Sequence, residues 1–135
     1  MTSRIVLVTL STLLAAVAFG CGRSTAGRHR VWGPVTCGGA PVVAGEILFT
    51  PDGSKQNGGP QGVATIRGGR FDTSGTRAPG VAGGAMIVRV AGALDARGSR
   101  VVTHEFAVDL PRTAHEFAIE IPASAATSSA DSAEN

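Results

Sequence analysis

The chain has 135 residues, which is enough for one small domain. Its 19 glycines and 7 prolines exceed average usage, whereas the aromatic residues are only five Phe and one Trp. Twelve Lys and Arg against ten acidic residues give a formal charge of +2, which excludes the basic footprint of a nucleic-acid-binding domain. Two cysteines without a His or Cys cluster exclude a zinc finger and a disulfide-stapled miniprotein.

Residues 1–20 have the form of a secretory leader. One positive charge, Arg4, precedes an apolar stretch over 5–19 that is short for a membrane span. The stretch ends in Ala18-Phe19-Gly20-Cys21, which resembles the lipobox of bacterial lipoproteins. That resemblance implies that residues 1–20 are removed and that Cys21 is lipidated. The domain would then be anchored by its N-terminal cysteine to a membrane of the cell envelope, outside the cytoplasm.

A second interpretation of the leader stays open. Ala16-Val17-Ala18 is an A-x-A signal, so an ordinary signal peptidase would cut before Phe19. Cys21 would then be a plain thiol, able to pair with Cys37 in an oxidising compartment. Under the lipoprotein interpretation, Cys37 is a small strand residue with a free thiol.

Composition divides the rest of the chain into three parts. Residues 21–29 lack apolar periodicity and are expected to form a flexible tether. Residues 123–135 are mostly Ala and Ser without a large apolar side chain, so we expect a disordered tail. Residues 30–122 remain as the folded domain.

Within the domain, short β-type runs alternate with Gly and Pro turn signals, a pattern typical of a sandwich or barrel. Gly68-Gly69 is expected to form a two-residue hairpin turn, because both positions accept positive φ. No segment has convincing helical periodicity, so the predicted class is all-β. The strands are expected over 30–37, 46–50, 62–67, 70–73, 85–91, 104–111 and 115–122.

The last two expected strands repeat each other. His104-Glu105-Phe106-Ala107-Val108-Asp109-Leu110-Pro111 recurs as His115-Glu116-Phe117-Ala118-Ile119-Glu120-Ile121-Pro122. We interpret the repeat as one hairpin, or as one pair spanning two sheets.

In a hairpin that pairs Leu110 with His115, like charges would face each other, because Asp109 would oppose Glu116 and Glu105 would oppose Glu120. Three features would relieve this repulsion: compensation by Arg89, a bound hard cation such as Ca²⁺, or strands in different sheets. The cation site is the weak alternative, and its ligands would be Glu105, Asp109, Glu116 and Glu120.

Glycines, prolines and apolar residues over 31–51 resemble the opening of carboxypeptidase regulatory-like domains in small bacterial lipoproteins. They run Val31-x-Gly33-x-Val35-Thr36, then Gly39-x-Pro41-Val42, then Gly45-x-Ile47-x-Phe49-x-Pro51. Gly69-Arg70-Phe71 and the segment from Pro79-Gly80 to Val90 are similar to later landmarks of the family. The resemblance implies a single prealbumin- or transthyretin-like (Ig-like) β-sandwich of about seven strands and no catalytic residue. Pro34 departs from the pattern and indicates an edge position or a bulge.

The residues themselves carry little catalytic chemistry. The sequence has no nucleophile elbow, and His104 and His115 share the parity of the apolar residues on their strands, which favours boundary histidines over metal ligands. We therefore expect a non-enzymatic binding or structural module without a metal or cofactor. An unknown protein or glycan partner would contact loops such as 51–61 and 91–100. The alternative is an accessory module that binds a carbohydrate or small ligand, with Trp32 as the one aromatic platform.

Overall fold

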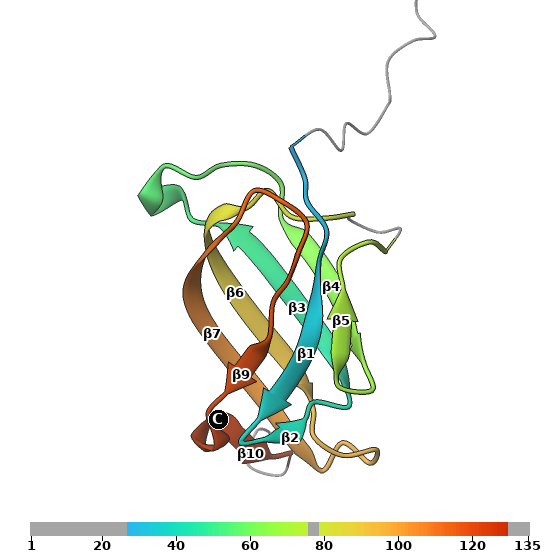
Figure 1. Ribbon diagram of the computed structural model, residues 1–135. Coiled ribbons are helices and arrows are strands. Elements are labelled where there is room, and N and C mark those ends of the chain that lie inside the picture. The colour runs from blue at the N-terminus through green and yellow to red at the C-terminus, as the bar shows by residue number, and fades with distance from the viewer. Residues whose placement is uncertain (1–26, 76–78, 130–135) are drawn as a thin grey trace, which may run out of the picture.

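A computed structural model describes residues 27–75 and 79–129, which are almost entirely β-structure (Figure 1). Two short 3-10 turns, η2 (Gly53–Lys55) and η3 (Ala123–Ala125), are the helical elements of these residues. The all-β prediction is therefore confirmed. The strands are β1 (Val31–Cys37), β2 (Ala40–Pro41), β3 (Ala44–Pro51), β4 (Gly62–Arg67), β5 (Arg70–Asp72), β6 (Gly84–Ala93), β7 (Arg100–Leu110), β8 (His115–Glu116), β9 (Ile119–Ile121) and β10 (Ala126–Ser128).

Hydrogen bonds link these strands into one sheet in the order β10-β7-β6-β3-β4-β5-β1-β2. Strands β8 and β9 pair with β1 in parallel, whereas the other pairs are antiparallel. Figure 1 shows that the sheet curls on itself into a half-barrel. Its two ends are β7 with β10 on one side and the β8–β9 segment on the other.

The core fills the inside of the curl because the strands alternate buried and outward side chains. Ile47 and Phe49 share one face of β3, as predicted, and both are fully buried. The ring centroid of Phe49 lies 5.9 Å from that of Phe71 on β5. Other buried members of this cluster are Val31, Val35, Cys37, Val42, Ala64, Ile66, Val81, Met86, Val88, Val90, Val102, Leu110, Ile119 and Ile121.

The turn between β4 and β5 forms where the sequence predicts it. Gly68 and Gly69 take φ of 57° and 78°, in the left-handed region that side chains disfavour. The strand before the turn, β4, has the predicted bounds of 62–67. The strand after it, β5, ends at Asp72, one residue earlier than predicted.

Pro34 lies inside the sheet, at a break in one ladder. Val35 N–H donates to Gly69 O at 2.8 Å, so the adjacent Pro34 nitrogen faces the opposite side, toward β8 and β9. β8 pairs with Val31 and Trp32, and β9 pairs with Val35 to Cys37, so the parallel ladder skips residues 33 and 34. The missing N–H of proline explains the interruption.

The repeated segment forms neither a hairpin nor a pair spanning two sheets, because its copies lie at different places in one sheet. β7 pairs with β6 and β10, whereas β8 and β9 pair with β1. Leu110 is therefore the register partner of Gly84, and His115 that of Val31. β7 pairs with β6 at ten positions, whereas the second copy pairs with β1 at five. The hairpin register would also have placed like charges opposite each other.

Both ends of the folded part extend beyond the predicted bounds of 30–122. His29 forms an isolated bridge with Val81, so the last tether residue belongs to the sheet. Residues 123–129 form η3 and β10, and the prediction of disorder is wrong there. The outer edge of β7 supplies backbone partners for β10, and Ala125 and Ala126 pack against the core. Residues 1–26 and 130–135 lie outside the described part.

Candidate functional site

The loop over 51–61, one of the two predicted partner-contacting loops, crosses one end of the half-barrel (Figure 1). Asp52 caps η2, with its carboxylate oxygen accepting from Ser54 N–H at 2.9 Å and from Ser54 Oγ at 2.6 Å. The bond from the Ser54 hydroxyl lowers the pKa of the Asp52 carboxyl. Asp52 N–H also donates to Ala85 O at 2.9 Å, so the loop is fixed to the start of β6.

Asn57 holds the same loop from inside. The residue is 8% exposed, and its Nδ2 donates to Gly83 O at 2.9 Å and to Ala85 O at 2.6 Å. Its Oδ1 lies 3.4 Å from Arg112 Nη2, in the segment after β7. Asn57 therefore joins the loop, the start of β6 and the segment after β7. Sequence reasoning missed it, because a lone Asn in a polar Gly-rich loop gives no signal of burial.

A hollow of about 600 Å³, which we call the Asn57 hollow, opens beside these contacts. Two cationic side chains, Lys55 and Arg112, and two acidic ones, Asp52 and Asp109, line it with Asn57. The apolar part of its lining comes from Ala85, Met86, Ala107 and Val108. Its volume is in the range of small-molecule sites, and its charges of both signs suit a polar ligand that carries both.

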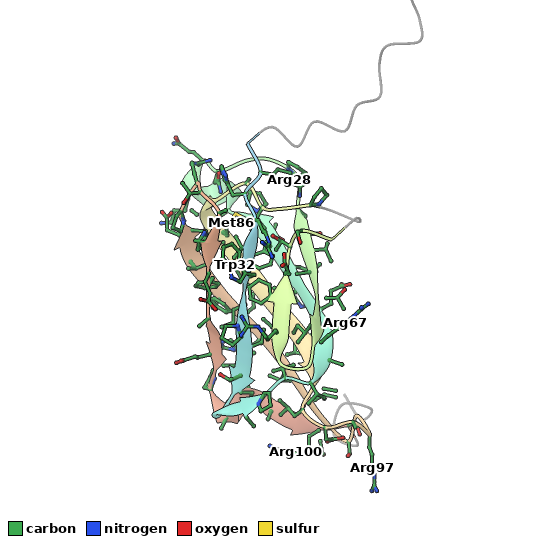
Figure 2. All side chains as sticks on the ribbon, turned by 45° about the vertical axis from the view of Figure 1, so that its right-hand side comes forward. Arg28, Trp32, Arg67, Met86, Arg97 and Arg100 are labelled. Atoms are coloured by element: carbon green, nitrogen blue, oxygen red, sulfur yellow. The ribbon has the colours of Figure 1, made fainter. Side chains whose placement is uncertain are left out.

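The second predicted loop, over 91–100, is shorter than expected and lies at the other end of the half-barrel. β6 continues to Ala93 and β7 begins at Arg100. Asp95 closes the connection by accepting from the N–H groups of Ser99 and Arg100 at 3.1 and 2.8 Å, and the bond from Ser99 lowers the pKa of Asp95. Figure 2 shows Arg97 and Arg100 at this end and Arg28 at the opposite one.

The four acids of the predicted cation site are exposed on two different parts of the sheet. Glu105 is the register partner of Arg89, the residue expected to compensate it, and Asp109 that of Ala85. Glu116 and Glu120 lie opposite Trp32 and Thr36 of β1. Among residues 27–75 and 79–129, no three His, Cys, Asp or Glu side chains gather closely enough to hold a metal ion.

The two strand histidines have local contacts. The His104 ring stacks on Phe106 with centroids 5.8 Å apart, and His115 Nδ1 lies 2.9 Å from Thr113 O. Both residues are half-buried, as expected for boundary positions.

Trp32 carries a cation on its ring. Arg30 Cζ lies 4.8 Å from the ring centroid, in cation–π geometry. The same guanidinium pairs with Asp72, with Arg30 Nε 3.1 Å from Asp72 Oδ1. This hydrogen bond holds the pKa of Asp72 well below its ordinary value. Arg30 therefore occupies a ring face on which a sugar would stack.

Cys37 is a buried free cysteine, with Sγ 3.6 Å from Pro122 O. Cys21, the predicted lipidation site, and the leader over 1–20 lie outside the described residues. Within the described ranges, no helix has the length and apolar character to cross a membrane.

The chain has no match among protein-family models, curated proteins or solved structures.

Proposed function

We propose that the chain is a non-enzymatic lipoprotein of the cell envelope, lipidated at Cys21, whose β-domain binds a ligand in the Asn57 hollow. The leader over 1–20 and its resemblance to a lipobox support the anchor. The finer assignment, a carboxypeptidase regulatory-like domain with a transthyretin-like fold, belongs to the same proposal and rests on the glycine and proline pattern over 31–51.

The observation that carries the binding function is the construction of the hollow. Three separate segments contribute charged groups to it: Asp52 and Lys55 from the loop, Asp109 from the end of β7, and Arg112 from the segment after it. Asn57 fixes the loop by two hydrogen bonds to the backbone beside β6. Such a prearranged site reduces the entropy cost of ordering side chains on binding.

The ligand class that fits is a small polar molecule with both charges, such as a free amino acid or a peptide terminus. A carboxylate would meet Lys55 and Arg112, and an ammonium group would meet Asp52 and Asp109. This observation favours the small-ligand alternative over a carbohydrate, since Arg30 already covers one face of Trp32.

The N-terminal segment joins the domain at the same end as the Asn57 hollow, which would place the hollow near the proposed lipid anchor at Cys21. Arg28 Nη2 donates to Gln61 O at 2.9 Å, at the end of the loop that borders the hollow. Figure 1 shows the N-terminal segment meeting the sheet at this same end. Six residues separate Cys21 from Arg28, so a lipid anchor at Cys21 would keep this end of the domain near the membrane.

Ligand binding is tested by titrating the isotopically labelled mature chain with free amino acids and dipeptides, followed by NMR. We expect shifts at the side-chain amide of Asn57 and at the backbone of 55–57 and 109–112. Lys55→Ala with Arg112→Ala should abolish them, whereas Arg97→Ala, at the opposite end, should not. Shifts that are absent for every probe, or that persist in the double variant, would overturn this assignment of the site.

Anchoring is tested by fractionating cells that express the full chain. The wild type and Cys37→Ala should sediment with membranes, and Cys21→Ser should be released. Equal release of all three would contradict the anchor.

A further inference from the structure

One side of β7 has no strand partner over most of its length. Leu94 N–H donates to Arg100 O on the β6 side, and Ser129 N–H donates to Ser99 O on the opposite side. Hydrogen-bonding direction alternates along an antiparallel strand, so the odd-numbered residues of β7 point their backbone groups away from β6. β10 covers that side only at residues 100–102. In the described part of the chain, the unpaired positions are Thr103, Glu105, Ala107 and Asp109.

The β8–β9 segment presents a second edge of the same kind. His115 N–H donates to Arg30 O and Phe117 N–H to Trp32 O, both toward β1. The alternate residues therefore direct their backbone groups away from β1. These outward residues are Glu116, Ala118 and Glu120, for which the described ranges contain no strand partner on that side.

Between the two edges lies a hollow, which we call the seam. Its lining includes His104 and Phe106 from β7 and Phe117, Ala118, Ile119 and Glu120 from the other edge. Phe106 and Phe117 are only half-buried, although both pack against the core. The half-barrel thus stays open where the repeated segment was predicted to pair.

Charge explains why the chain does not close the seam itself. Four of the seven outward positions on the two edges are acidic, and all four side chains are exposed. Direct pairing would place carboxylates opposite carboxylates, which is unfavourable. Arg70 of β5 compensates part of this charge, because its Nη2 lies 3.4 Å from Glu116 Oε1. Arg89 of β6 is the register partner of Glu105. A second copy of the same edge would meet the same repulsion.

We propose that the seam binds an extended segment of a partner protein with Lys or Arg at alternate positions and apolar residues between them. The segment would add as a strand to the free edge of β7, by main-chain hydrogen bonds. Its apolar side chains would pack between Phe106 and Phe117, and its basic side chains would lie among Glu105, Asp109, Glu116 and Glu120. This surface shares Ala107 and Asp109 of β7 with the Asn57 hollow and otherwise lies apart from it. Its occupant is of a different class.

The test uses the mature chain and a synthetic Lys-Val repeat peptide, with a Glu-Val repeat and a fully N-methylated Lys-Val repeat as control peptides. We expect the Lys-Val peptide to bind and to slow amide exchange at Glu105, Ala107, Glu116 and Ala118. The Glu-Val peptide should fail because of its charge, and the N-methylated peptide because it has no backbone N–H to donate to the edge.

Charge reversal on the edge gives the matched variants. Glu105→Lys with Glu120→Lys should weaken Lys-Val binding by roughly tenfold or more, whereas Glu46→Lys, on β3, should leave it unchanged. Equal binding of the N-methylated peptide, protection outside the two edges, or equal weakening by Glu46→Lys would overturn the proposal. So would self-association of the mature chain through β7, or thermal stabilisation by calcium without peptide binding. If the Lys-Val peptide does not bind, the proposal for the seam is overturned. The amino-acid titration still tests the Asn57 hollow independently.

Discussion

The backbone of Phe117 passes so close to Gly33 that no side chain fits between them. A Cβ added to Gly33 would lie 2.1 Å from the carbonyl oxygen of Phe117. The contact is with backbone, which cannot rotate aside as a side chain can. It sits beside Pro34, at the break in the parallel ladder between β1 and the last segment.

Gly33→Ala should therefore destabilise the domain, by about 1–3 kcal/mol or more, because β1 and the last segment must move apart. Gly58→Ala is the matched control, since a Cβ there meets nothing within 4 Å. Urea denaturation of both variants measures the difference. A Gly33→Ala protein as stable as Gly58→Ala would show that the last segment does not lie against β1.

Asn57 should be the most sensitive polar residue of the loop. Asn57→Ala removes the donor to the Gly83 carbonyl, whereas the Ala85 carbonyl keeps the bond from Asp52 N–H. We expect a cost of about 1–3 kcal/mol. Lys55→Ala, exposed in the same loop, should change the free energy of unfolding by less than about 0.5 kcal/mol. Equal effects in thermal melts would contradict the anchoring role of Asn57.

The C-terminal strand can be tested by truncation. Ending the chain at Pro122 removes η3 and β10, so the β7 edge at 100–102 loses its partner and the core loses Ala125 and Ala126. We expect a loss of about 1–3 kcal/mol, as a few hydrogen bonds and partly buried methyl groups disappear. Ending the chain at Ser129 keeps β10 and should leave the melting temperature unchanged. A stable chain ending at Pro122 would restore the predicted disordered tail.

Asp72 should make the domain sensitive to acid. Its folded pKa is lowered, chiefly by the hydrogen bond from Arg30, whereas the unfolded value is about 3.9. The stabilisation is therefore present above about pH 4 and is lost as the pH falls through the folded pKa. Asp72→Asn should lower the melting temperature at neutral pH and flatten its decline in acid.

Arg30→Gln is the companion variant for Asp72. It should flatten the acid profile in the same way, and the double variant should be little worse than either single one. The effect is small because the pair is largely exposed. Additive losses would show that Arg30 and Asp72 act independently.

The local sequence pattern was sufficient to predict most strands and turns. It was not sufficient to predict pairing between segments that are distant in the sequence. The alternation around Ile47 and Phe49 and the Gly68-Gly69 turn follow from nearest neighbours, so they could be predicted. The pairing of residues 115–121 with β1 could not, because parallel pairing leaves no local turn signal and the repeat favoured a hairpin. Residues 126–128 have no apolar signal of their own, and their order comes from the edge of β7.

The sequence predicted the loop that borders the candidate site but not the side chains that meet there. The sequence indicated the 51–61 loop as a contact surface, because Pro51, Asp52 and Gly53 mark a turn between strands. The contact between Arg112 and Asn57 could not be predicted, because the two residues are 55 positions apart in the sequence. The four acids were recognised from the repeat, yet their distribution on two separate edges depends on the strand order.

The most direct test of the proposed lipid-anchored binding module is the mass of the mature N-terminus, extracted from membranes of cells that express the full chain. We predict a first residue Cys21 whose mass is increased by acyl chains. An unmodified chain that begins at Phe19 would contradict the anchor, and with it the placement of the domain at a membrane surface.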